Sequence, residues 1–166
     1  ERYRGIRCES ACVGQATDNW QMTMSRILGI DFGSHRIGLA LSDETGIIAM
    51  PFETVPGRDV PAAIRRIKEV CVEKEVSRIV VGLPLNMNGT AGPAAVGAEE
   101  FAKALRAGTG IEVVMSDARL STAIVERMLI EADTRRDKRK QVRDPLAAQV
   151  ILQGYLDRMS SDQEAL

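Results

Sequence analysis

The order of strand-like and helix-like segments is the feature that most limits how this chain can fold. Three apolar segments come first, separated only by short turns, and this spacing predicts antiparallel strands. The segments cover residues 26–31, 36–42 and 47–55. Pro51 lies in the third segment and indicates an edge strand or a bulge, because proline has no backbone N–H to donate to a strand ladder.

The rest of the chain alternates between helix-like and strand-like patterns. Two of its apolar segments are almost continuous, as buried parallel strands usually are. The predicted helices cover 60–74, 94–107, 120–132 and about 144–158, and the predicted strands cover 76–84 and 111–117. Helices that alternate with strands in this way cover the faces of a sheet. The sequence therefore predicts an α/β fold with a five-stranded mixed sheet, in which three antiparallel strands precede two parallel ones.

The apolar spacing also predicts which faces of two helices carry apolar side chains. Phe101 and Leu105 are expected to face the core from the second helix. Leu120, Ile124 and Met128 are expected to share one face of the third.

A single domain is expected over residues 24–158. The chain has 166 residues, of which 45% are hydrophobic, and this suits one domain with a substantial core. Residues 1–23 lack a clear period, so we interpret them as a disordered extension or an artefact of the start position, with a genuine N-terminal arm as the alternative. Residues 159–166 are expected to form a frayed tail.

Composition argues against several classes of site. The chain has 22 Lys and Arg against 23 Asp and Glu, so a nucleic-acid site would need a local basic patch. A single histidine and three cysteines without paired spacing argue against a zinc site and a disulfide framework, which favours a reducing cytoplasm. No apolar stretch approaches the length of a membrane span, so no membrane partner is expected.

Asp31 is a carboxylate at the end of the first apolar strand, where a charged side chain is unusual. One interpretation is a metal site for cleaving a nucleic acid. The other is a hairpin that approaches nucleotide phosphates, since sugar kinases and actin-like ATPases open with a similar GIDFG segment. Those proteins need two such lobes with a cleft between them, and the patterned region here supplies one.

Two further aspartates are predicted to lie near Asp31. Asp117 ends the fifth strand, and Asp144 opens the last helix on the face that also carries Ala148 and Ile151. Carboxylates that are packed together repel one another, and a divalent cation such as Mg²⁺ or Mn²⁺ removes that cost. The alternative is that Asp117 and Asp144 simply cap helices, a position that favours aspartate.

Four segments match one known family in the same order along the chain. They are GIDFGSHRIGLALSD (29–43), VVGLPLNMNGTAGP (80–93), SDARLST (116–122) and VRDPLAAQVILQGYL (142–156). In these segments the chain resembles the YqgF family, also called RuvX. The resemblance implies a ribonuclease-H-like fold and a cytoplasmic, metal-dependent nuclease, proposed to trim the 5′ end of precursor 16S rRNA or, for some relatives, to act on branched DNA. It also implies that the family's acidic positions fall on Asp31, Asp117 and Asp144.

Two positions depart from the pattern of this family. The family usually has glutamate where this chain has Ala118, and aspartate where it has Asn88. Both changes remove negative charge that a cation could use. The alternative to a nuclease is therefore a nucleic-acid-binding factor with little catalytic activity.

A basic segment leads into Asp144 and is expected to contact phosphates and to be mobile without substrate. Its predicted nucleic-acid-binding residues are Lys138, Arg139, Lys140 and Arg143, and a solvated charge run is the alternative. Arg36 and Arg119 lie near the predicted carboxylates and either bind the scissile phosphate or pair with the acids. The loop residues Asn86, Asn88, Gly89 and Thr90 are also expected to contact nucleic acid, unless they form an ordinary turn.

The expected partners follow from these residues and from the resemblance. They are structured RNA or branched DNA, in the setting of a precursor ribosomal particle, with the protein as a monomer or weak dimer. Aromatic residues make up only 4% of the chain, so recognition is expected to depend on the nucleic-acid backbone and shape.

Overall fold

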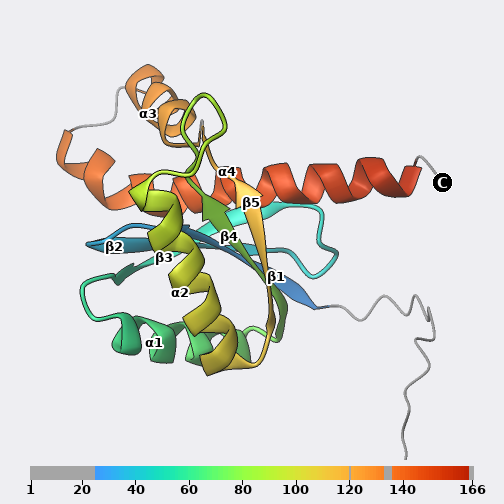
Figure 1. The fold of residues 1–166 in the computed structure, drawn as a ribbon. Coiled ribbons are helices and arrows are strands. Elements are labelled where there is room, and N and C mark those ends of the chain that lie inside the picture. Colours follow the sequence, from blue (N-terminus) through green and yellow to red (C-terminus); the bar gives the residue numbers. More distant parts are fainter. Residues whose placement is uncertain (1–24, 120, 133–135, 165–166) are drawn as a thin grey trace, which may run out of the picture.

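Five strands form one mixed sheet in the computed structural model, which describes residues 25–119, 121–132 and 136–164 (Figure 1). The strands are β1 (Arg26–Phe32), β2 (Arg36–Ser42), β3 (Ala49–Pro56), β4 (Val76–Leu83) and β5 (Glu112–Asp117). Their order across the sheet is β3-β2-β1-β4-β5. The pairs β3–β2 and β2–β1 are antiparallel, and β1–β4 and β4–β5 are parallel. The predicted mixed sheet is therefore confirmed, with β3 at one edge.

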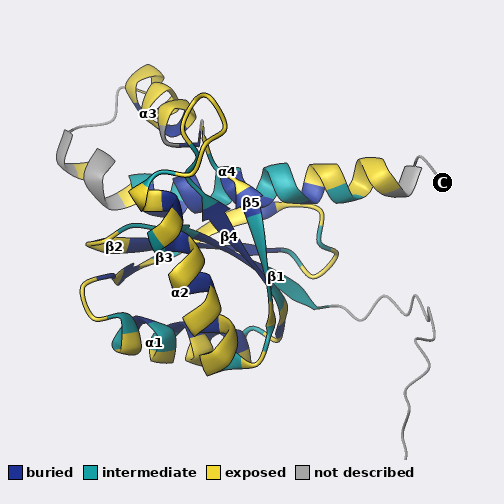
Figure 2. Cartoon of the chain, viewed as in Figure 1, coloured by how far each residue is buried: buried dark blue, intermediate teal, exposed yellow. Residues whose placement is uncertain are grey.

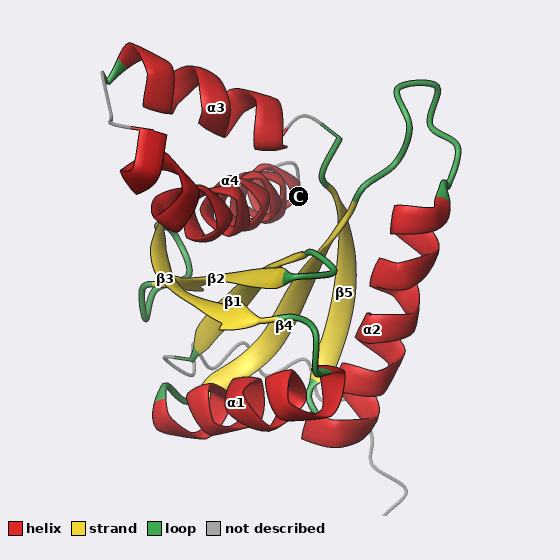
Figure 3. Ribbon diagram, turned by 90° about the vertical axis from the view of Figure 1, so that its left-hand side faces the viewer, coloured by secondary structure: helices red, strands yellow, loops and turns green. Residues whose placement is uncertain are grey.

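Helices cover both faces of this sheet (Figure 3). The helices are α1 (Val60–Glu73), α2 (Pro93–Thr109), α3 (Ser121–Glu131) and α4 (Arg136–Glu164). α1 and α2 pack on one face, where Phe101 and Leu105 are buried as predicted, and α4 crosses the other face. α3 packs against the outside of α4 (Figures 1 and 3). Figure 2 shows the buried residues concentrated between the sheet and these helices. No helix in the described ranges is both long and apolar enough to cross a membrane.

Glycines in the strands allow α4 to lie directly on the sheet. A Cβ atom at Gly38 in β2 would lie 2.0 Å from the backbone oxygen of Asp144. A Cβ atom at Gly29 in β1 would lie 2.6 Å from the Cβ of Leu152. Real Cβ atoms do not approach so closely, so any larger residue would push the helix away. The contact at Gly38 thus fixes how far Asp144 stands from the sheet.

Replacing Gly38 with alanine is expected to lower the free energy of unfolding by about 2 kcal/mol or more, because the new methyl group meets helix backbone that cannot rotate away. Urea unfolding measures this change. Gly97→Ala in α2 is the matched control, since its Cβ would lie 3.6 Å from Phe32, at ordinary contact distance. Equal stability of the two variants would show that α4 does not rest on Gly38 as described.

Two helices differ from the sequence prediction. α4 begins at Arg136 rather than near Asp144, although Asp144–Pro145 is a typical helix start. Lys, Arg and Gln residues precede this pair and favour helix, so the helix continues upstream and the basic segment is helical from Arg136. α4 also continues to Glu164, whereas the sequence predicts a frayed tail over residues 159–166. Residues 1–23, 165 and 166 lie outside the described residues.

α3 buries a different face from the one that its apolar spacing suggests. Val125 and Leu129 are buried against Ala147 of α4. Ile124 and Met128 are 43% and 56% exposed, and Leu120 lies outside the described residues. The reason is that α3 packs on another helix rather than on the sheet, so its neighbour selects the buried side. Ile124, on the exposed side, lines a pocket described below.

Candidate metal and nucleic-acid site

Strand register brings Asp31 next to Asp144. Asp31 of β1 pairs with Gly38 of β2. Gly38 lies directly beneath the backbone of Asp144 in α4. Side chains alternate along a strand, so Asp31 points to the same side of the sheet as Gly29, which Leu152 of α4 covers. Two carboxylates from distant parts of the chain therefore meet between the sheet and α4.

The surroundings of Asp31 disfavour its charged form. Burial raises the pKa of this carboxyl from 3.8 to about 6, with a further contribution from the negative charge of Asp144 and an opposing one from Arg143. A carboxylate held in this state gains strongly from a nearby cation. Perturbed carboxyl groups of this kind are typical of functional sites.

Asp144 is buried, at 8% exposure, and its charge is incompletely compensated by hydrogen bonds. Arg36 Nη1 lies 3.7 Å from Oδ2 and Arg143 Nε lies 3.5 Å from Oδ1. Among the described residues, no group donates a hydrogen bond to the buried Oδ2. Asp144 lies well inside α4, so it does not cap this helix. A buried acceptor of this kind costs free energy unless a cation or donor reaches it.

Asp117 is held by another partner. Its carboxylate accepts hydrogen bonds from the backbone N–H of Arg119 at 3.0 Å and from its Nε at 2.8 Å, and Nη2 lies 2.6 Å away. These hydrogen bonds keep the pKa of Asp117 below its usual value. Within the part of the chain that the structure describes, no three His, Cys, Asp or Glu side chains are grouped closely enough to hold a metal. The structure thus brings together Asp31 and Asp144 and leaves Asp117 apart.

The residue after Asp117, Ala118, lies close to the two paired carboxylates. A Cβ atom at Gly82 of β4 would lie 3.1 Å from the Cβ of Ala118 and 2.6 Å from Cδ1 of Ile151. Gly82 follows Val81, which pairs with Ile30 in β1, so it lies beside Asp31. Ala118 packs into the apolar cluster under α4. Position 118 therefore adjoins the carboxylate pair from the β5 side.

The predicted nucleic-acid-binding residues that are basic fall into three groups. Arg36 and Arg143 adjoin Asp144, and Arg143 Nη1 also lies 3.8 Å from Glu126. Lys138 is exposed on α4, whereas the side chains of Arg139 and Lys140 lie outside the described residues. Arg119 is committed to Asp117.

The loop after β4 is stabilised by hydrogen bonds between its own residues. Asn86 donates from Nδ2 to Thr90 Oγ1 at 2.9 Å, and the Thr90 backbone N–H donates to Asn88 Oδ1 at 3.1 Å. Gly89 has φ +82°, a left-handed conformation that favours glycine at the turn. These contacts leave Met87 75% exposed at the loop. Contact of the loop with nucleic acid stays a prediction.

A basic hollow that includes Arg36 was not predicted from the sequence. It has a volume of about 660 Å³ and is lined by His35, Arg36, Thr54, Pro56 and Arg58. Arg58 reaches this place because the preceding Gly57 donates its backbone N–H to the carbonyl of His35, which ties the β3–α1 turn to the β1–β2 turn. The sequence around Arg58 gives no sign that these two turns lie together. The hollow shares Arg36 with the surroundings of Asp144.

These features define a ribonuclease-H-like fold with a buried carboxylate pair beneath its last helix. The profile of the family described as "RuvX: Holliday junction resolvase" matches residues 25–158. The chain belongs to this nuclease family, which confirms the predicted family and enzyme class.

Curated relatives agree with this assignment. A protein of Bacillus cereus (strain AH187) is 50% identical over 135 residues, covering 80% of this chain and 98% of the relative. A protein of Geobacillus sp. (strain WCH70) is 48% identical over 134 residues, covering 80% and 97%. Both are named "Putative pre-16S rRNA nuclease".

A solved structure supports the fold independently. It is described as T. thermophilus RuvC in complex with Holliday junction substrate, with a TM-score of 0.51 and 16% identity. The match covers 81% of this chain and 96% of the RuvC chain. At this identity the similarity shows the shared fold alone.

Proposed function

We propose that this protein is a divalent-metal-dependent endonuclease that hydrolyses phosphodiester bonds in structured RNA, with the 5′ end of precursor 16S rRNA as its substrate. The observation that carries the proposal is the buried pair of Asp31 and Asp144, with Oδ2 of Asp144 lacking a hydrogen-bond donor among the described residues. The names of the close relatives support the choice of RNA.

The donor set fits Mg²⁺ or Mn²⁺. These ions take oxygen ligands, and Mg²⁺ is commonly held by one or two carboxylates together with water and substrate phosphate oxygens. Asp31 and Asp144 would hold the ion, and binding would satisfy the oxygen that no hydrogen bond reaches. A bound divalent ion supplies an activated water and stabilises the leaving oxygen of the cleaved phosphodiester. Asp117 remains a predicted ligand, and its hydrogen bonds to Arg119 must open before it could contribute.

The arginines around the pair bind and orient the substrate in this proposal. Arg36 and Arg143 flank Asp144 from two elements and place positive charge where a scissile phosphate would approach. Arg58 extends this charge along the basic hollow that it shares with Arg36. Contacts of this kind fix the position of the nucleic-acid backbone and do not read sequence. We place the reaction in the cytoplasm, on a precursor ribosomal particle, with the protein as a monomer or weak dimer.

Branched DNA is the second candidate substrate, because the family's description names a Holliday junction resolvase. With Mn²⁺ we expect cleavage of a precursor rRNA end, and slower or no cleavage of a four-way DNA junction, in assays at equal enzyme concentration. Faster cleavage of the junction would favour the resolvase function. Binding of either substrate without cleavage would instead favour the nucleic-acid-binding factor that Ala118 suggests.

A further inference from the structure

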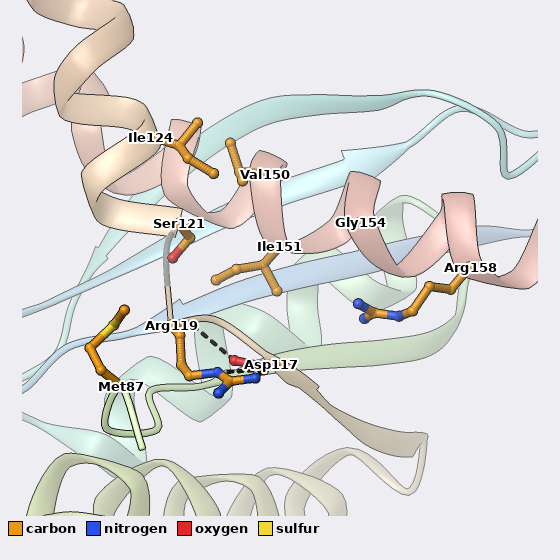
Figure 4. Close-up of a pocket in the computed structure, with 9 residues that line it drawn as sticks. All are labelled: Met87, Asp117, Arg119, Ser121, Ile124, Val150, Ile151, Gly154 and Arg158. Atoms are coloured by element: carbon orange, nitrogen blue, oxygen red, sulfur yellow. Dashed lines mark hydrogen bonds and ion pairs between the residues drawn. The ribbon is translucent and has the colours of Figure 1, made fainter. Parts of the chain in front are cut away.

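A pocket separate from the Asp31–Asp144 pair lies between the loop after β4, the end of β5 and the middle of α4 (Figure 4). Its volume is about 340 Å³, at the lower end of the range for small-molecule sites. Met87 and Ile124 lie on opposite sides, and Val150 and Ile151 add apolar wall from α4 (Figure 4). Gly154 leaves the helix side open, since nothing lies within 4 Å of where its Cβ would be.

Two guanidinium groups complete the pocket. Arg119 is fixed by its ion pair with Asp117, and its side chain remains 39% exposed. Arg158 donates from Nη2 to the buried Ser116 Oγ at 2.5 Å, which anchors it to β5. Planar guanidinium groups bind phosphates and stack on bases. Asp117 also lines the pocket and pairs with Arg119, so the pocket combines apolar walls for a flat ring with the guanidinium of Arg158 for an anion.

The pocket lies along α4 from the proposed metal site. Ile151 follows Asp144 by seven residues, which at 1.5 Å per residue separates them by about 10 Å along the helix. This distance spans roughly three stacked nucleotides of one strand at 3.4 Å each. A strand whose phosphate lies at Asp144 can thus place a neighbouring nucleotide in the pocket.

We propose that this pocket takes one unpaired nucleotide of the substrate, with its base between Met87 and Ile124 and a phosphate on Arg158. The inference rests on the proposed nuclease function for its ligand class, and it adds a requirement on the substrate. A base paired in a duplex cannot enter a pocket of this kind, because its faces are stacked and its edge is occupied. The nucleic acid must therefore be single-stranded within a few nucleotides of the cleaved bond.

Gly154→Leu tests the proposal by filling the pocket from α4 without removing any charge. The measurement is binding by fluorescence anisotropy, in EDTA, of a labelled single-stranded RNA oligonucleotide and of the same strand paired with its complement. We expect the parent protein to prefer the single strand by about tenfold, the scale of one base contact, and Gly154→Leu to lose that preference. Ser161→Leu adds the same side chain at an exposed site of α4 outside the pocket and should keep the preference.

The outcomes separate the pocket from the nuclease function. Equal binding of both RNAs by the parent protein, or an unchanged preference in Gly154→Leu, overturns the pocket proposal. A preference that Gly154→Leu removes supports the pocket even if no form of the protein cleaves, and in that case the nuclease proposal alone fails. Ile124→Glu, at an exposed position of α3, repeats the test should Gly154→Leu not fold, and it should also abolish the preference.

Discussion

Asp31→Asn is expected to abolish metal-dependent cleavage and, in the absence of metal, to make the protein more stable at neutral pH. Loss of a direct ligand should lower activity by at least about a hundredfold, since even outer-shell partners of metal ligands contribute 10- to 100-fold. The stability gain follows from the pKa of Asp31, which burial and Asp144 raise from 3.8 to about 6. Asparagine has nearly the same shape and carries no charge to bury.

The size of this effect depends on pH. Because the folded protein holds the Asp31 proton more tightly than the unfolded chain, the stabilisation from protonation is fully present below pH 3.8 and is lost as pH rises through about 6. The pKa difference corresponds to about 3 kcal/mol. We therefore expect urea unfolding in EDTA to show the parent protein losing stability between about pH 4 and 7, while Asp31→Asn does not share this loss.

Asp43 offers a control with the opposite sign. It is half-buried in the β2–β3 turn, and hydrogen bonds from Thr45, Ile48 and Ile47 lower its pKa to about 2. Asp43→Asn should therefore destabilise the protein at neutral pH and leave cleavage unchanged. Mn²⁺ should raise the melting temperature of the parent protein and of Asp43→Asn, but not of Asp31→Asn. Mn²⁺-dependent cleavage that survives in Asp31→Asn would remove Asp31 from the metal site.

The Asp31–Asp144 pair was predictable because each residue belongs to a segment with a clear period. Asp31 follows a buried strand, and Asp144 shares its helix face with Ala148, which is buried against the sheet. When a strand and a helix pack against each other, the periods of their apolar residues predict which side chains lie at the interface. The same reasoning holds for Phe101 and Leu105, which are buried as predicted.

The same reasoning does not predict the position of the Asp117 side chain. The position of a side chain at the end of a strand depends on the turn that follows, and here Asp117 bonds to the backbone and side chain of Arg119. An aspartate side chain can hydrogen-bond to neighbouring residues instead of binding a metal. The spacing of apolar residues in the sequence does not reveal such local hydrogen bonds. Likewise, the helix start predicted at Asp144–Pro145 and the buried face of α3 were decided by tertiary neighbours.

Ala118→Glu is expected to raise Mn²⁺ affinity and the cleavage rate by about tenfold or more. Position 118 lies beside Gly82, which separates it from Asp31 and has no side chain of its own. A carboxylate there adds a third oxygen donor and negative charge next to the pair, and ligand charge is a main determinant of affinity for hard cations. The same charge is costly in the apolar cluster that contains Ala118, so the metal-free variant should be less stable than the parent protein.

Ala118→Gln separates the effect of charge from that of size, since it has nearly the same shape as glutamate and no negative charge. Calorimetric titration with Mn²⁺ and cleavage of the precursor rRNA end should both improve with glutamate and not with glutamine. Equal behaviour of the two variants would mean that position 118 does not reach the metal. A parent protein that already cleaves rapidly would show that Asp31 and Asp144 suffice, and would exclude the binding factor with little catalysis. A slow parent and a fast Ala118→Glu variant would instead trace the low activity to the absence of one carboxylate beside Gly82.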